Sequence, residues 1–145
     1  MSEAVHDSIR VQATPDAVMD VITDIEAYPD WQDEIKEAHV LAGDEQGRPI
    51  RARFTIDAKV FQTTYTLGYH YEADTMAWDL EEGDQLDTLT GAYRLQDMGD
   101  GTTDVTYELT VALKLRLPGL VRRQAAKRIV DGALKGMKRR VESKG

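Results

Sequence analysis

Residues 120–143 read LVRRQAAKRIVDGALKGMKRRVES, and this segment is the most informative part of the chain about its fold. No proline interrupts it, and at a helical rotation of about 100° per residue its apolar residues fall on one side, opposite lysine and arginine. The apolar side consists of Ala126, Ile129, Val130, Ala133, Leu134, Met137 and Val141. The pattern predicts one amphipathic helix of about 24 residues, roughly 36 Å long. Such a helix needs an apolar surface to cover.

Two glycines lie four residues apart near the border of the apolar side, at Gly132 and Gly136. Glycine in a helix interior is less favourable than alanine by about 1 kcal/mol, so a steric reason is expected. Two interpretations stay open: the glycines allow the helix to approach the sheet closely, or they leave room for a ligand.

The residues before this helix predict an antiparallel sheet. Stretches of alternating apolar and polar residues occur at 4–12, 35–42, 50–57, 61–72, 76–81, 86–97 and 105–114. Turn-forming clusters separate them, with Gly43–Gly47, Gly83-Asp84 and Gly99-Asp100-Gly101 as the strongest signals. Short turns between successive strands indicate an antiparallel meander, which can bury one face.

Helical signals interrupt the strands only near the start. Thr14-Pro15-Asp16 supplies a capping oxygen, a proline at the first helical position and an early acid, so a helix is expected to run to about Ile25. Pro29 then interrupts regular structure, and Asp33 and Glu34 favour a second short helix. The predicted class is α+β, one domain over residues 1–145, with a curved antiparallel sheet of about seven strands wrapped around the C-terminal helix. The two short helices follow the first strand and close one end.

Five short motifs carry a family resemblance in this order: Thr14–Val18 (TPDAV), Tyr28–Trp31 (YPDW), Gly91–Leu95 (GAYRL), Gly101–Tyr107 (GTTDVTY) and Leu117–Leu120 (LPGL). The chain resembles the START-like, Bet v 1-like helix-grip superfamily over nearly its whole length, and in particular bacterial members of its polyketide cyclase/dehydrase and lipid transport family. The resemblance implies a cavity between sheet and long helix, usually for an apolar small molecule. It does not imply one reaction.

Aromatic residues dominate the strand faces that are expected to point inward, with Tyr71 on the same face. The candidate ligand-binding residues are Trp31, Phe54, Tyr65, Tyr69, Trp78, Tyr93 and Tyr107. Rings with polar tips suit a cavity that holds and orients a small molecule. The competing interpretation is an ordinary core, with Trp31 as a hydrophobic plug.

Two functions stay open. The first is non-enzymatic binding or carriage of a lipid, a quinone or a polyketide-like molecule. The alternative is a polyketide cyclase or dehydratase, which needs a polar group such as Tyr65, Tyr69 or Asp57 in a dry cavity. Strand alternation argues against the enzyme, because it points Arg51, Arg53 and Arg94 outward, toward surface ion pairs with Asp79 or Glu81. No catalytic residue is therefore assigned.

No metal or cofactor is expected. His6, His39 and His70 are scattered without the spacing of a metal site, and Asp30, Asp33 and Glu34 fit a solvated helix start. The chain holds no cysteine, and it has no glycine-rich phosphate loop, serine-centred elbow or HExxH motif.

Charge is distributed unevenly along the chain, which has a formal net charge of −8. From Lys114 onward the net charge is +9, and the residues before it carry −17. The favoured interpretation is a basic helix face that meets the acidic body of the same molecule. Weak peripheral contact with an anionic membrane through this helix is a further hypothesis. Nucleic acid is not expected, because the tyrosines would lie buried under the helix.

With no apolar run long enough to cross a bilayer and no secretory signal, we expect a cytoplasmic protein.

Overall fold

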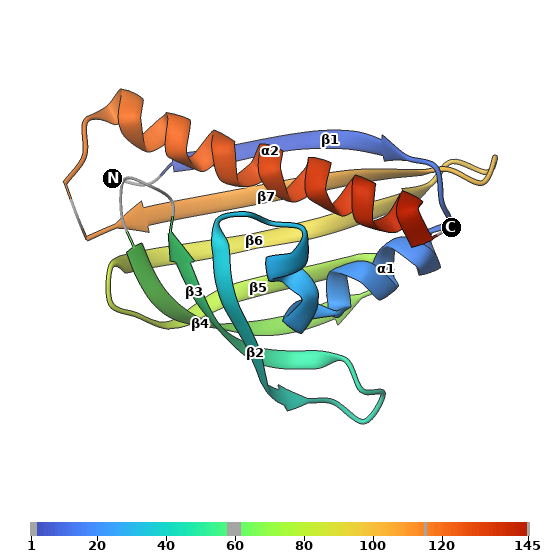
Figure 1. The fold of residues 1–145 in the computed structure, drawn as a ribbon, viewed down its shortest axis with the longest axis horizontal. Helices are drawn as coiled ribbons and strands as arrows, with labels where there is room; N and C mark the ends of the chain where they lie inside the picture. Colours follow the sequence, from blue (N-terminus) through green and yellow to red (C-terminus); the bar gives the residue numbers. More distant parts are fainter. Residues whose placement is uncertain (1–2, 58–61, 115, 145) are drawn as a thin grey trace.

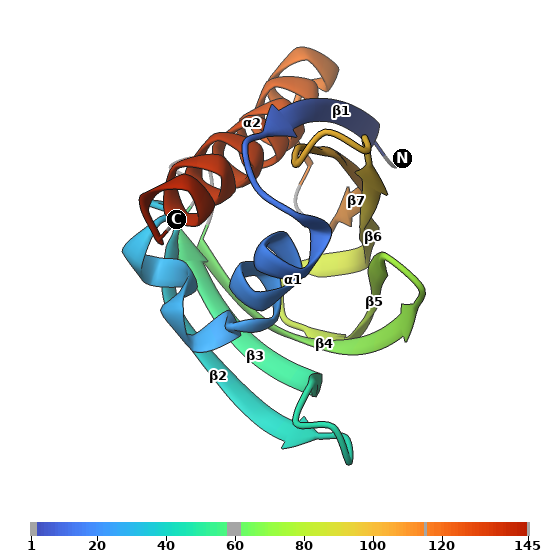
Figure 2. The same ribbon diagram turned by 90° about the vertical axis from the view of Figure 1, so that its right-hand side faces the viewer.

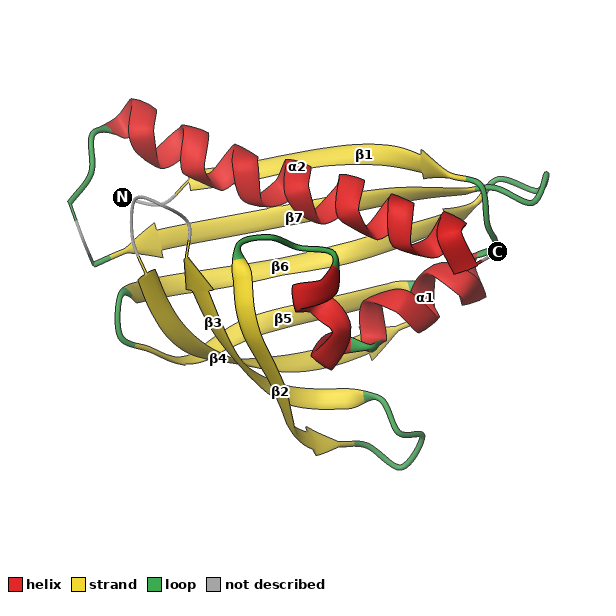
Figure 3. Cartoon of the chain, in the orientation of Figure 1, coloured by secondary structure: helices red, strands yellow, loops and turns green. Residues whose placement is uncertain are grey.

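A computed structural model describes residues 3–57, 62–114 and 116–144. Figures 1 and 3 show a curved sheet with a long helix lying across it and two short helices at one end. In chain order the elements are β1 (Glu3–Val11), α1 (Pro15–Thr23), the 3₁₀ helix η1 (Ile25–Asp30), β2 (Ile35–Gly43), β3 (Pro49–Asp57), β4 (Gln62–Glu72), β5 (Thr75–Gly83), β6 (Leu86–Asp97), β7 (Thr103–Leu113) and α2 (Gly119–Lys144). The predicted helix-grip architecture is confirmed.

The seven strands form one antiparallel sheet in the order β1-β7-β6-β5-β4-β3-β2. The first strand pairs with the last, with Val5 opposite Leu109 and Ile9 opposite Val105, while the other pairings join strands that follow one another along the chain. Seen end-on, the sheet curls so that β1 and β2 approach α2 from opposite sides (Figure 2). The concave face of the sheet therefore encloses a space that the long helix closes.

The long helix packs on β1, on β7 and against α1. Its buried residues are Ala126, Val130, Ala133, Leu134, Gly136, Met137 and Val141, which is the predicted apolar side, and Ile129 is partly buried beside them. Burial of this side stabilises the helix on the sheet, since most helical stability in proteins comes from tertiary packing. Within the described residues, no helix combines the length and the apolarity needed to span a bilayer.

The first helix begins as predicted. The Thr14 hydroxyl accepts a hydrogen bond from the Ala17 backbone at 3.3 Å, and Pro15 occupies the first turn. The second short helix, however, lies earlier than expected: α1 ends at Thr23 and η1 occupies Ile25–Asp30, with Pro29 inside it. A 3₁₀ helix of six residues has few hydrogen bonds to lose, so it tolerates a proline that would break a longer α-helix.

The hairpin of β2 and β3 extends past the helices (Figure 1). Strand alternation predicts Ile50 on the inward face together with Ala52, Phe54 and Ile56, but Ile50 is 39% exposed, whereas the other three are buried. Val40 and Leu41 are exposed on the paired strand, which departs from regular register at this point. The prediction for Ile50 is wrong because alternation alone does not show where a strand leaves the covered part of a sheet.

The basic helix meets acidic groups of its own chain, as the charge pattern predicts. Arg122 and Arg123 lie 3.3 and 3.8 Å from the two carboxylate oxygens of Glu3. Arg140 lies 3.9 Å from Asp30 in η1. Two further pairs, Lys135–Asp131 and Lys138–Glu142, lie within the helix. Much of the positive charge of α2 is thereby matched in cis.

Candidate functional site

A cavity of about 290 Å³ lies between the concave face of the sheet and α2. This volume is close to the lower end of the range for small-molecule sites, about 300–1,000 Å³. Its buried lining is mostly aromatic and aliphatic, and its less buried lining is mostly polar, apart from Ile35 and Ile129. The buried part consists of Tyr28, Trp31, Phe54, Ile56, Tyr65, Leu67, Tyr69, Trp78, Leu86, Leu89, Tyr93, Tyr107, Leu109, Val111 and Ala133.

All seven candidate residues predicted from the sequence lie around this cavity. Phe54 comes from β3, Tyr65 and Tyr69 from β4, and Trp78 from β5. Tyr93 and Tyr107 come from β6 and β7, and Trp31 follows η1. Their contact with a ligand stays a prediction, but the sheet brings them to one space.

Tyr71 packs against the core, as expected for the inward face, but lies outside the cavity lining. Its ring is half-buried beneath the Arg48 guanidinium, 4.5 Å from the ring centroid, and its hydroxyl donates a hydrogen bond of 2.5 Å to the Pro49 carbonyl. It is not part of the cavity lining. The strand runs past the end of the cavity at this residue.

The rings around the cavity form two groups. In the first, Tyr28 contacts Trp31 edge to face at 4.9 Å between centroids, and Phe54 stacks on Tyr65 at 5.4 Å. In the second, Trp78 lies 5.4 Å from Tyr107 and 5.7 Å from Tyr93. Such pairs add about 0.5–1.5 kcal/mol each beyond the burial of their area, so they hold the walls in fixed positions.

Gly91 makes room for the second group. It pairs with Trp78 across β5 and β6, and a Cβ placed on it would lie 2.6 Å from Cζ2 of the Trp78 ring. The backbone carbonyl of Glu108 lies closer still. Only a residue without a side chain leaves room for the Trp78 ring to pack this closely on β6, where it forms part of the cavity wall.

The tyrosine hydroxyls differ in their partners. Tyr28 donates a hydrogen bond of 2.5 Å to the Ile22 carbonyl at the end of α1. In the part of the chain that the structure describes, the hydroxyls of Tyr65, Tyr69 and Tyr107 make no hydrogen bond, although each residue is less than a tenth exposed. All three residues line the cavity, and their hydroxyls are not among the fully buried polar atoms that lack a partner, so they stay accessible to an occupant with oxygen or nitrogen atoms.

Burial raises the pKa of every phenol that lines the cavity. Desolvation of the charged form is the largest cause in each case, and for Tyr93 the Gln32 side chain opposes it. All five phenols are therefore neutral at physiological pH and serve as hydrogen-bond donors rather than as bases.

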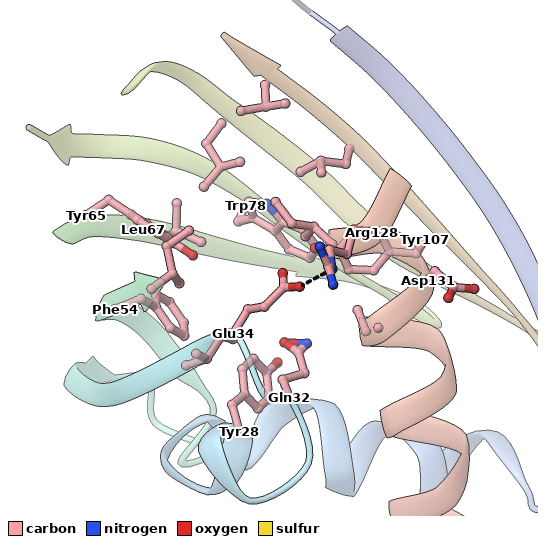
Figure 4. Close-up of a pocket in the computed structure, with 18 of the residues that line it drawn as sticks. Tyr28, Gln32, Glu34, Phe54, Tyr65, Leu67, Trp78, Tyr107, Arg128 and Asp131 are labelled. Carbon is pink, nitrogen blue, oxygen red and sulfur yellow. Dashed lines mark ion pairs between the residues drawn. The ribbon is translucent and has the colours of Figure 1, made fainter. Parts of the chain in front are cut away.

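The exposed part of the lining forms a charged rim. Arg128, Asp131, Gly132 and Arg139 come from α2, and Asp33 and Glu34 come from the segment between η1 and β2. Figure 4 shows the Glu34 carboxylate reaching across the opening to the Arg128 guanidinium, and the two lie 3.2 Å apart. This ion pair joins the two sides of the opening.

The two helical glycines have different surroundings, and neither of them allows close approach to the sheet. A Cβ on Gly136 would collide with the Trp31 carbonyl oxygen and lie 3.0 Å from Cε3 of its ring. Gly136 thus allows close approach, to the segment after η1 rather than to the sheet. Gly132 lines the cavity, and a Cβ there would meet no atom within 4 Å. Gly132 leaves open space at the rim.

The groups considered for catalysis lie elsewhere, apart from Tyr65 and Tyr69. Asp57 is not part of the lining, and its carboxylate accepts a hydrogen bond from Gln62. Arg51 and Arg94 point outward as predicted, Arg51 to Glu81 at 2.6 Å and Arg94 to Glu108 at 2.9 Å. Glu108 is a partner that alternation along one strand did not suggest. Among the described residues, no three histidine or acidic side chains come close enough together to hold a metal ion.

Sequence reasoning missed several lining residues. Tyr28 was present in the YPDW motif, and its helix context gave no sign of an inward ring. The sequence places Glu34 and Arg128 on solvated faces, because no local pattern relates two residues that are 94 positions apart. Gly132 is the rim residue that the sequence did indicate, because a glycine inside a predicted helix needs a steric reason.

Comparison with known proteins agrees with this geometry. A family model described as polyketide cyclase / dehydrase and lipid transport matches residues 2–142. Among solved structures, a START superfamily protein from Mycobacterium smegmatis superposes with a TM-score of 0.89 at 25% identity, covering 98% of this chain and 99% of that one. A search of curated sequences found no match.

More distant structures share the fold. The Zhui aromatase/cyclase from Streptomyces sp. R1128 has a TM-score of 0.80 at 16% identity, covering 98% of this chain and 94% of that one. A STAR-related lipid transfer protein from Xanthomonas axonopodis has a TM-score of 0.76 at 16% identity, with 96% and 85% covered. The fold is thus one that cyclases and lipid transfer proteins share.

Proposed function

Since this chain belongs to the polyketide cyclase / dehydrase and lipid transport family, we propose that it binds an apolar small molecule in the cavity and acts as a carrier rather than as an enzyme. A quinone or a polyketide-like molecule fits the lining better than a simple acyl chain. The observation that carries this proposal is the set of three phenols that line the cavity, Tyr65, Tyr69 and Tyr107, whose hydroxyls make no hydrogen bond to any residue that the structure describes.

The chemistry of the lining supports binding over catalysis. Aldol closure and dehydration need a base close to the reacting carbon. The buried lining offers only phenols, whose pKa values burial raises. The carboxylates of the lining, Asp33, Glu34 and Asp131, belong to its rim. Neutral phenols orient the oxygen atoms of a ligand, and the rings around them supply apolar contact.

The experiment combines ligand identification with a blocked cavity. Native mass spectrometry of freshly purified protein is expected to show a bound small molecule of more than one ring. N-phenyl-1-naphthylamine, a neutral dye that fluoresces in apolar surroundings, is expected to bind and to compete with that molecule. Gly132→Leu places a side chain in the open space at the rim and should weaken dye binding at least ten-fold. Equal binding by this variant would contradict the proposed site.

A second candidate is a polyketide cyclase or dehydratase. The two phenols of β4, Tyr65 and Tyr69, favour it, because a neutral phenol can donate a proton to a ketone oxygen. Turnover of a poly-β-ketone mimic by the purified protein, lost in Tyr65→Phe or Tyr69→Phe, would support this candidate. No turnover would leave the carrier function, whereas turnover that both variants retain would contradict it and would exclude these two phenols as the proton donors.

A further inference from the structure

We propose that Arg128 binds an anionic group of the ligand at the rim of the cavity, with Glu34 as the residue that positions its guanidinium. This inference rests on the proposed function, since it assigns the ligand class of the same cavity: an amphiphile with a ring-containing apolar body and a carboxylate, or another small anion, at one end.

The ion pair with Glu34 occupies only one nitrogen of the Arg128 guanidinium. Nε of Arg128 lies 3.2 Å from Oε1 of Glu34, and within the described part of the chain Arg128 has no other ion pair or hydrogen bond. A guanidinium carries five N–H donors, and one contact through Nε leaves the terminal amino groups available. The Glu34 contact holds the plane of the group while those donors stay open to an anion.

The second observation is the empty space beside Arg128. Gly132 lies one helical turn further along α2, and a Cβ there would meet nothing within 4 Å. Helical side chains lean toward the preceding turn, so the missing side chain at 132 would have covered the surface next to Arg128. A ligand that projects from the cavity through this gap would bring its outer end to the guanidinium, since Arg128 and Gly132 both line the cavity.

The other charged residues of the rim also favour an anion at Arg128. Asp131 lies 3.2 Å from Lys135 on the same helix, so its charge is matched. Arg139 is a second cation of the lining, on the same side of α2. The side chain of Arg128 is 55% exposed, against 25% for that of Glu34, so the arginine is the member of the pair that an incoming ligand meets first. Guanidinium pairs carboxylates and similar anions through parallel hydrogen bonds, which gives the rim a preference for acids.

Two dyes with the same ring system test this assignment. N-phenyl-1-naphthylamine is neutral, and 1-anilinonaphthalene-8-sulfonate carries one sulfonate. The quantity measured is the ratio of their affinities, sulfonate over neutral dye, from fluorescence titration of the full chain. Arg128→Gln is expected to lower this ratio about ten-fold. Glu34→Gln keeps an oxygen for Nε but removes a negative charge, so it should raise the ratio about three-fold.

A matched control removes long-range charge effects. Lys127→Gln takes the same charge from the neighbouring exposed position of α2, which does not line the cavity, and should change the ratio less than two-fold. Thermal unfolding of each variant confirms that it folds. An unchanged ratio in Arg128→Gln, or an equal fall in Lys127→Gln, would overturn the role of Arg128 while the cavity stands. Failure of the wild-type chain to bind either dye would contradict the proposed function itself.

Discussion

The carbonyl oxygen of Trp31 lies directly against the α-carbon of Gly136, so that the segment after η1 and the middle of α2 touch through backbone atoms. Two ion pairs flank this contact, Glu34 with Arg128 and Asp30 with Arg140. One close backbone contact and two ion pairs thus hold the segment against the helix. The segment covers one side of the cavity.

The two glycines of α2 are expected to respond in opposite directions to the same change. Gly136→Ala forces the Trp31 segment away and should lower the free energy of unfolding by about 1–3 kcal/mol. Gly132→Ala enters open space and gains helix propensity, so it should raise the free energy of unfolding by up to about 1 kcal/mol. Urea denaturation measures both. Stabilisation by Gly136→Ala would contradict the close contact.

Gly91→Ala is expected to destabilise the sheet at the floor of the cavity. The new methyl group would collide with the Trp78 ring and with the Glu108 carbonyl, at a loss of about 2 kcal/mol in the free energy of unfolding. The double variant Gly91→Ala, Trp78→Phe should recover part of that loss, since a smaller ring relieves one of the two collisions. Additive losses in the double variant would show that the ring is not the obstacle.

Removal of a tyrosine hydroxyl should lower the free energy of unfolding at Tyr28, which donates a hydrogen bond, but not at a tyrosine that faces the cavity. Tyr28→Phe leaves the Ile22 carbonyl without its partner and should lower the free energy of unfolding by about 1–3 kcal/mol. Tyr107→Phe removes a hydroxyl that has no hydrogen-bond partner among the described residues, so stability should stay within about 0.5 kcal/mol of the wild type or rise, while dye affinity changes. Equal losses in the two variants, measured by urea denaturation, would argue that Tyr107 has a partner.

The buried phenols predict a loss of stability at high pH. Their folded-state pKa values lie above the ordinary value of 10.0, so the folded protein keeps protons that the unfolded chain releases. Their contribution to stability is therefore fully present below pH 10 and falls above it, by about 1.4 kcal/mol per pH unit for each such group. Urea denaturation between pH 8 and 11.5, with absorbance at 295 nm to follow phenolate, measures this. Full ionisation of the folded protein near pH 10 would be inconsistent with burial.

The sequence determined the architecture because its signals are local. Period-two alternation, glycine turns and the amphipathic pattern of residues 120–143 each depend on near neighbours, and together they fix seven strands and a covering helix. The same alternation placed Phe54, Tyr65, Tyr69 and Trp78 on the inner face. Alternation did not show that Ile50 is exposed or that Tyr71 lies outside the cavity lining, since the period of a strand does not show where the covered part of a sheet ends.

How the cavity is closed depends on contacts that no local sequence pattern predicts. The contact of Trp31 with Gly136, the fit of Trp78 against Gly91 and the pairing of Glu34 with Arg128 all join residues far apart in the chain. Such contacts depend on how the sheet curls and on where α2 crosses it, and no local pattern carries that information. The sequence thus determined which side chains face inward, whereas the curvature of the sheet decided that they surround a space and which charges meet at its rim.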